Sequence, residues 1–262
     1  MCNNNNEIKA KEFFVFSYFN ILPADLFKKK KGKFDEFNSY EEYVAYKCAY
    51  RAYLDVCRTI KYSVTTTEIE QDKKKYDGYM DLKKAFIDYE INLILTQINN
   101  IQNTKEDFDK WHNSLCNKML IDNNNFKQKL NTNADIELLF KANKNGKDEN
   151  SFKYGMVQKW LNMTIKNILL LNDMYNDNIT GYDLNKYKHL FHVPVDKNIL
   201  KAAKDLGITK KNGKSYSIEG WSNWNDKTYQ NFTDALNKKI KEKFPYQCPL
   251  DWEHTVWMEF TE

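Results

Sequence analysis

The stretch KYGMVQKWLNMTIKNILLL, residues 153–171, predicts a helix that is apolar around most of its circumference. At 3.6 residues per turn, four polar side chains fall on one narrow stripe of this helix. They are Gln158, Lys159, Asn162 and Lys166. A helix this apolar must be packed on most sides, so the stripe faces either open solvent or a cleft. The choice between these two bears directly on function.

The composition indicates a large domain built from helices. The chain has 262 residues, of which 42% are hydrophobic and 15% aromatic, and this is enough for a packed core. Eight glycines and four prolines are too few turn-forming residues for a many-stranded sandwich or barrel. We therefore predict an all-α protein.

Charge and cysteine usage restrict the class of protein only weakly. The net charge of +4 permits a polyanionic partner but does not argue for one by itself. Five scattered cysteines without a CxxC pair indicate reduced thiols rather than a zinc site or a disulfide framework. The N-terminus lacks the order of a signal peptide, and no apolar run reaches the roughly 18–20 residues of a membrane span. We expect a cytoplasmic monomer that does not contact a membrane.

Apolar spacing and capping residues predict the other helices. They span 39–62 with Ser39 as N-cap, 80–102, 104–121, 133–143, 197–206, 225–244 and 249–260. An Asn-Gly centre predicts a small hairpin within 208–218. The lysine run at 28–31 is expected in an N-terminal loop, facing solvent rather than phosphate.

Two residues are candidates for chemistry. Lys159 lies near the positive N-terminal end of its helix among large apolar side chains, which disfavours the ammonium and favours a nucleophilic amine. Taken alone, an ordinary solvated lysine is the simpler interpretation. Asp196 follows Val-Pro-Val and is the expected N-cap of the 197–206 helix. The same carboxylate can face a cleft and hold the proton of a nucleophile.

Three segments together resemble one family of enzymes. GMVQKWLNMTIK (155–166) and FHVPVDKNIL (191–200) resemble the lysine helix and the aspartate turn of helix-hairpin-helix DNA glycosylases. The likeness is closest to archaeal 8-oxoguanine DNA glycosylases, which have a Gln-Lys pair, a second lysine seven residues later and an Ile-Pro-Ile-Pro-Val-Asp segment. PLDWEHTVW (249–257) resembles the Pro-Leu-x-x-Asp-x-x-x-Trp segment of that family.

The resemblance implies a role for each matching residue. Lys159 is the nucleophile, Lys166 is not, and Asp196 is the catalytic aspartate. Glu253 and Trp257 contact the extruded base, although Glu stands where the family has Asp. Further site residues lie within these segments or just before them: Gln158 and His192 as base-binding residues, and Gly155 and Lys153 as contacts to the DNA backbone. No metal or other cofactor is implied.

The resemblance also implies a fold and an activity. The fold is a two-lobed helix-hairpin-helix glycosylase domain over 1–262, with one lobe of about 1–79 plus 195–262, another of about 80–194, and a DNA cleft between them. The activity is excision of an 8-oxoguanine-like base from double-stranded DNA, with β-elimination (AP lyase) activity, in base excision repair at the nucleoid. Two alternatives stay open: antiviral action on modified bases of phage DNA, and a non-catalytic helical protein that binds nucleic acid or another partner.

Overall fold

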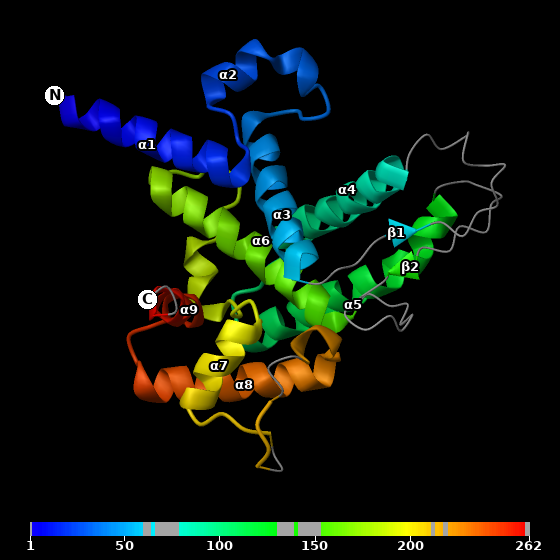
Figure 1. Ribbon diagram of the computed structural model, residues 1–262, viewed down its shortest axis with the longest axis vertical. Helices are drawn as coiled ribbons and strands as arrows, with labels where there is room; N and C mark the ends of the chain where they lie inside the picture. The colour runs from blue at the N-terminus through cyan, green and yellow to red at the C-terminus, as the bar shows by residue number, and fades with distance from the viewer. Residues whose placement is uncertain are drawn as a thin grey trace.

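The protein is mostly helical in the residues that its computed structural model describes (Figure 1). These residues are 2–59, 64–65, 79–129, 139–140, 153–210, 213–216 and 220–259. Within them, strands β1 (Val64–Thr65) and β2 (Leu139–Phe140) form a short antiparallel pair. The predicted all-α class is confirmed.

Helix α6 (Tyr154–Tyr175) is the helix predicted from the 153–171 stretch, and it runs through the middle of the molecule (Figure 1). Helix α3 (Tyr40–Thr59) packs along it. The small side chain of Ala49, which is fully buried, lets the two helices come close. The Trp160 indole N–H donates to the Ala49 carbonyl oxygen at 3.0 Å, so even the polar atom of this buried ring is satisfied.

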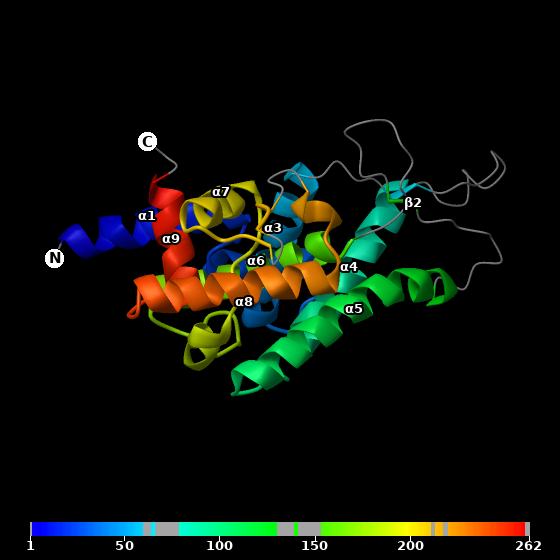
Figure 2. The ribbon, with the colours of Figure 1, turned by 90° about the horizontal axis from the view of Figure 1, so that it is seen from below.

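Three further helices of the described chain, α4 (Tyr79–Ile98), α5 (Lys105–Lys129) and α8 (Asp226–Lys243), pack around this central pair. Helix α4 packs against α3, and α5 packs against both α4 and α6. Helix α8 also contacts α6. Seen from below, α8 runs between α5 on one side and α7 and α9 on the other (Figure 2).

The C-terminal part of the chain supplies short elements near the N-terminal half of α6. Helix α7 (Lys197–Asp205) packs against α9 (Pro249–Glu259), and α9 also touches α8 and the 3-10 helix η2 (Asn185–Leu190). The 3-10 helix η3 (Trp221–Asn223) packs directly on α6. These elements carry three of the residues that the sequence singles out, namely Asp196, Glu253 and Trp257, and α6 carries most of the others.

The N-terminal elements differ from the prediction. Helix α1 (Cys2–Phe19), which the sequence reasoning did not predict, contacts α3. Part of the lysine run belongs to helix α2 (Ala24–Lys29), and the rest borders or begins the 3-10 helix η1 (Lys31–Lys33). The expected loop was therefore wrong. Two lysines in the last turn of α2 are favourable there because the C-terminal end of a helix is negative.

Most of the other local predictions hold with small shifts of the ends, but the helix predicted at 104–121 continues to Lys129 as α5, and one predicted helix is wrong. Ser39 caps α3, because its hydroxyl accepts the Glu42 backbone N–H at 3.1 Å. The hairpin is present as a pairing of Thr209 with Ser215. The helix at 133–143 was wrong where the structure describes it, since Leu139–Phe140 is strand β2. Short apolar runs fit either state, and the rest of that segment lies outside the described residues.

The division into two lobes stays a prediction. Helix α3, which was assigned to one lobe, makes its most extensive contacts with α6, which was assigned to the other. The Asn167 side chain on α6 donates to the Cys48 carbonyl oxygen on α3 at 3.0 Å. In the described part of the chain, no helix is long and apolar enough to cross a membrane.

Candidate functional site

The N-terminal end of α6 is pressed against η3. A Cβ atom on Gly155 would lie 1.9 Å from the Trp221 carbonyl oxygen, so only glycine permits this approach. The Gly155 N–H donates to the Trp224 carbonyl oxygen at 3.1 Å, which leaves it committed within the protein rather than open to a phosphate. The contact holds the Trp221 ring beside α6, with its centroid 5.0 Å from the Lys159 Nζ.

Lys159 and Asp196 meet, as the sequence predicted. The Lys159 Nζ lies 3.5 Å from the Asp196 Oδ2, and both residues are buried, at 4% and 8% exposure. The other oxygen of the carboxylate, Oδ1, caps α7 by accepting the backbone N–H groups of Asn198 (2.9 Å) and Ile199 (3.1 Å). Asp196 is therefore both the predicted N-cap and the partner of the lysine.

Gln158, which the sequence reasoning assigned to base contact, is held by hydrogen bonds within the protein. Its Nε2 donates to the carbonyl oxygens of Gly155 (2.8 Å) and Val195 (3.3 Å). Its Oε1 accepts from Asn162 Nδ2 (3.1 Å) and from the Val195 N–H (3.4 Å). Both N–H groups and both acceptor positions of this buried amide are thus in use, so a base would have to break one of these bonds. Gln158 instead ties Val195, and with it the neighbouring Asp196, to α6.

His192 also lies inside the protein rather than at an open surface. Its Nε2 is 2.8 Å from the Asp109 Oδ1, and its Nδ1 is 3.0 Å from the Tyr229 hydroxyl. Burial lowers the pKa of His192, although the hydrogen bond to Asp109 opposes this. Contact with a base, as predicted, would require these bonds to open.

The network around His192 was missed in the sequence. The Tyr229 hydroxyl accepts from Asn162 Nδ2 at 2.9 Å, and the Asn162 Oδ1 lies 2.9 Å from His112 Nε2. This hydrogen-bond network joins helices α5, α6 and α8, and Asn162 connects it to Gln158. The sequence offered only a weak indication of this network. His112 lies between apolar positions of its helix, where a buried histidine is common, but the sequence does not identify the hydrogen-bond partner.

Glu253 brings two other predicted residues together. Its Oε1 accepts from Lys166 Nζ at 2.6 Å and from Trp257 Nε1 at 3.1 Å. Its Oε2 is buried and has no hydrogen-bond partner among the residues that the structure describes. Burial raises the pKa of Glu253, the Lys166 ammonium opposes this, and the Asp196 carboxylate adds to the increase. Glu253 therefore lies within electrostatic reach of the Lys159–Asp196 pair.

The site residues thus come from three elements: α6, the N-terminal end of α7, and α9. Lys159, Asp196 and Glu253 are buried, whereas the Trp257 residue is 38% exposed and the Lys166 side chain 27% exposed. Trp257 and Lys166 are therefore the members of this group that are most exposed to solvent. We call Lys159, Asp196, Glu253, Lys166 and Trp257 the lysine site. Lys153, the remaining predicted residue, precedes α6 and is half-buried.

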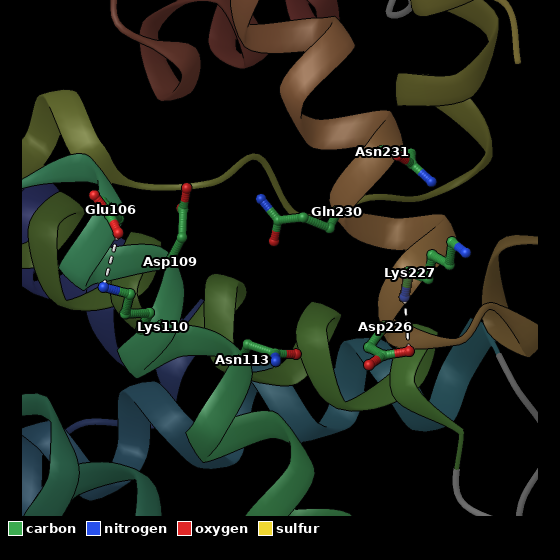
Figure 3. Close-up of a pocket in the computed structure, with 8 residues that line it drawn as sticks. All are labelled: Glu106, Asp109, Lys110, Asn113, Asp226, Lys227, Gln230 and Asn231. Atoms are coloured by element: carbon green, nitrogen blue, oxygen red, sulfur yellow. Dashed lines mark hydrogen bonds and ion pairs between the residues drawn. The ribbon is translucent and has the colours of Figure 1, made fainter. Parts of the chain in front are cut away.

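The lysine site is separate from two surface pockets. A pocket of about 420 Å³ lies between α5 and α8, and Figure 3 shows its charged and amide side chains. Its lining consists of Glu106, Asp109, Lys110, Asn113, Asp226, Lys227, Gln230 and Asn231. A second pocket, of about 450 Å³, lies at the C-terminal end of α6 and is lined by Asn and Asp residues. Within the described residues, no cluster of His, Cys, Asp and Glu is arranged to hold a metal ion.

Comparisons with known proteins add no assignment. No family model, no curated protein and no solved structure matches this chain. The lysine site and the sequence segments that compose it are therefore the features from which we infer a function.

Proposed function

We propose that the protein is a DNA glycosylase with AP lyase activity, in which Lys159 is the nucleophile and Asp196 the catalytic carboxylate. The observation that carries the proposal is the 3.5 Å approach of the Lys159 Nζ to the Asp196 Oδ2 in a buried site. A lysine held in this way, beside a carboxylate that can accept its proton, is suited to form a Schiff base. The resemblance of three segments to helix-hairpin-helix glycosylases supports the same chemistry.

The reaction begins with binding of double-stranded DNA in a cleft between two lobes. The target nucleotide leaves the base stack at a cost of roughly a few kcal/mol and enters the site. Trp257, the most exposed member of the lysine site, stacks on the base, and Glu253 binds the edge of the base by hydrogen bonds. Because Glu253 is buried, the base must approach past Trp257 and Lys166.

The chemical step forms one bond and breaks another. The neutral Lys159 amine attacks C1′ of the sugar, and the bond from C1′ to the base breaks with its electron pair leaving on the base. Asp196 accepts the proton of the amine and stabilises the positive charge that develops on the sugar. Ring opening gives a Schiff base at C1′, from which β-elimination cleaves the strand.

The capping bonds of Asp196 favour this chemistry. Two backbone N–H groups hold Oδ1, so Oδ2 faces Lys159 without any rearrangement of the side chain. A carboxylate that is oriented before the reaction does not have to reorganise as charge develops. The backbone bonds of Gln158 to Val195 hold the same turn from the other side.

The proposed substrate is an oxidised guanine in base excision repair. A modified base in phage DNA would use the same lysine chemistry and would make the protein an antiviral enzyme. These two substrates are distinguished by which duplex reacts. A panel of duplexes, each carrying one modified base, therefore belongs in the test of the proposal.

Borohydride trapping on this panel tests the nucleophile. The intact protein is expected to form a covalent complex with the duplex that carries its substrate, because borohydride reduces the Schiff base. Lys159→Gln is expected to abolish trapping while duplex binding persists. Lys188→Gln is the matched control, because Lys188 is a surface lysine paired with Asp251 at 2.9 Å, and it should trap normally.

Two outcomes contradict the proposal in different ways. Undiminished trapping by Lys159→Gln would show that another residue is the nucleophile. Duplex binding without trapping on any modified base would indicate a non-catalytic protein that binds nucleic acid.

A further inference from the structure

The two oxygens of the Glu253 carboxylate have unequal surroundings. Oε1 already accepts two hydrogen bonds, from Lys166 Nζ and from Trp257 Nε1. Oε2 is buried and has no partner among the described residues. A buried acceptor without a donor is unfavourable, so this atom is the place where a ligand N–H gains most by binding.

Lys166 places a donor beside this acceptor. Its Nζ is 2.6 Å from the Glu253 Oε1, and its side chain is 27% exposed, against 2% for Glu253. An ammonium group has three N–H donors, and the bond to Glu253 uses one of them. The pair therefore presents an N–H donor and a carboxylate acceptor next to each other, with the donor on the more exposed of the two side chains.

We propose that Lys166 and Glu253 together bind the lactam edge of the extruded base. Glu253 Oε2 accepts the ring N–H, and Lys166 Nζ donates to the neighbouring carbonyl oxygen. On a guanine-type base these groups are N1–H and O6. The inference depends on the proposed glycosylase function. It assigns Lys166 to substrate specificity, whereas the resemblance implied only that Lys166 is not the nucleophile.

The alternative contact is a bidentate one by Glu253 alone. In that arrangement the two carboxylate oxygens would accept N1–H and the 2-amino group of guanine. Both acceptor positions of Oε1 are already taken by Lys166 and Trp257. Bidentate binding would therefore break an existing bond, whereas the lactam contact uses the groups that are still available.

The two arrangements predict different roles for the 2-amino group. Binding of the lactam edge leaves it outside the contact, so its removal should have little effect. An adenine-type base in the same position has an amino group at position 6, where Lys166 needs an acceptor. Its N1 carries a lone pair, where Glu253 needs an N–H donor. Such a base should be rejected.

The test compares three duplexes that differ only in the target base: 8-oxoguanine, 8-oxohypoxanthine, which lacks the 2-amino group, and 8-oxoadenine. Single-turnover excision is measured on each. We expect the first two rates to agree within about threefold and the third to be at least roughly thirtyfold lower, as the loss of a paired edge contact implies.

Substitution of Lys166 isolates its contribution. Lys166→Met should reduce the preference for 8-oxoguanine over 8-oxoadenine by about tenfold, because one of the two edge contacts is lost, while Lys166→Arg should retain most of it. The readout is a ratio of rates on two substrates, which a purely structural role would leave unchanged. Lys188→Met serves as the control. Lys166→Met leaves the buried Glu253 carboxylate without its counter-charge. The Lys166→Met/Glu253→Gln double variant, which removes both charges, is therefore measured alongside the single variant. Circular dichroism checks that each variant is folded.

The outcomes separate this inference from the proposed function. A loss of about tenfold or more on removal of the 2-amino group, or an unchanged preference in Lys166→Met, overturns the inference. If borohydride still traps a covalent complex between Lys159 and DNA when either of these results is obtained, the proposed function stands. Absence of trapping on all three duplexes overturns the inference together with the guanine-type substrate on which it depends.

Discussion

Asp196 performs two tasks because its two carboxylate oxygens have different partners. Oδ1 is fixed by two backbone N–H groups at the start of α7, and Oδ2 is directed at the Lys159 Nζ. The capping bonds stabilise the helix and at the same time fix the orientation of the side chain. The stability and the chemistry of this residue can therefore be separated by a substitution that keeps one oxygen.

Asp196→Asn is that substitution. The amide oxygen can still cap α7, since Asn and Asp are similar N-caps, but the other atom becomes an N–H donor that cannot accept a proton from Lys159. We expect the single-turnover excision rate to fall at least about a hundredfold. Thermal denaturation should show a melting temperature within a few degrees of the unmodified protein.

A cap on another helix provides the control. Asn225 caps α8 by accepting the Thr228 N–H at 2.9 Å, and Asn225→Asp should change neither the rate nor the melting temperature noticeably. An Asp196→Asn protein with full excision activity would remove Asp196 from the mechanism.

Helix α6 shows how one polar stripe is divided among several tasks. Gln158 and Asn162 are buried and bind other parts of the chain, Lys159 meets Asp196, and the half-buried Lys166 meets Glu253. The stripe therefore faces α5 and the elements that follow α6 in the chain rather than open solvent. Its position depends on the close contact of Gly155 with η3.

Gly155→Ala should disturb that contact. The added Cβ would overlap backbone atoms of Trp221, so α6 and η3 must separate, and overpacking of this kind costs about 1–3 kcal/mol. We expect chemical denaturation to show a lower free energy of unfolding, and Trp221 to move from Lys159. Gly32→Ala is the control, because a Cβ there meets no atom within 4 Å among the described residues. Equal stability of both variants would show that η3 adjusts freely.

The molecule as a whole buries ionisable groups whose effects on stability have opposite signs. Burial lowers the pKa of His112 and His192, so these residues take up protons more readily in the unfolded chain. Their contribution to stability is present above the unfolded pKa of about 6.5 and is lost as the pH falls. Burial raises the pKa of Glu253, and its contribution is lost as the pH rises through that pKa.

Glu253→Gln should make the histidine effect visible by removing the opposing group. We expect the free energy of unfolding of this variant to fall by about 2–3 kcal/mol between about pH 7.5 and pH 5.5, since two histidines then bind protons only in the unfolded chain. Denaturant titrations at several pH values measure the change, and the unmodified protein should show a smaller fall. A variant whose stability does not change over this range would show that the histidines are protonated in the folded protein.

Rules that act within a few residues were sufficient for much of this protein. Apolar spacing located the central helix, and the Ser39 and Asp196 caps were predicted correctly, because a cap binds backbone groups only two or three residues away. The all-α class followed from the same local patterns. Those patterns failed at Leu139–Phe140, where an apolar run fits a helix and a strand equally well.

The partners of the polar side chains required the folded chain. Lys159 meets a carboxylate 37 positions away, and Lys166 meets one 87 positions away. Helical spacing shows that Gln158 and Lys166 share a stripe, but it does not show that the first is enclosed by backbone groups and the second lies beside a buried glutamate. Such differences depend on which distant elements pack against each turn of α6, and that packing is a property of the whole core rather than of any short segment.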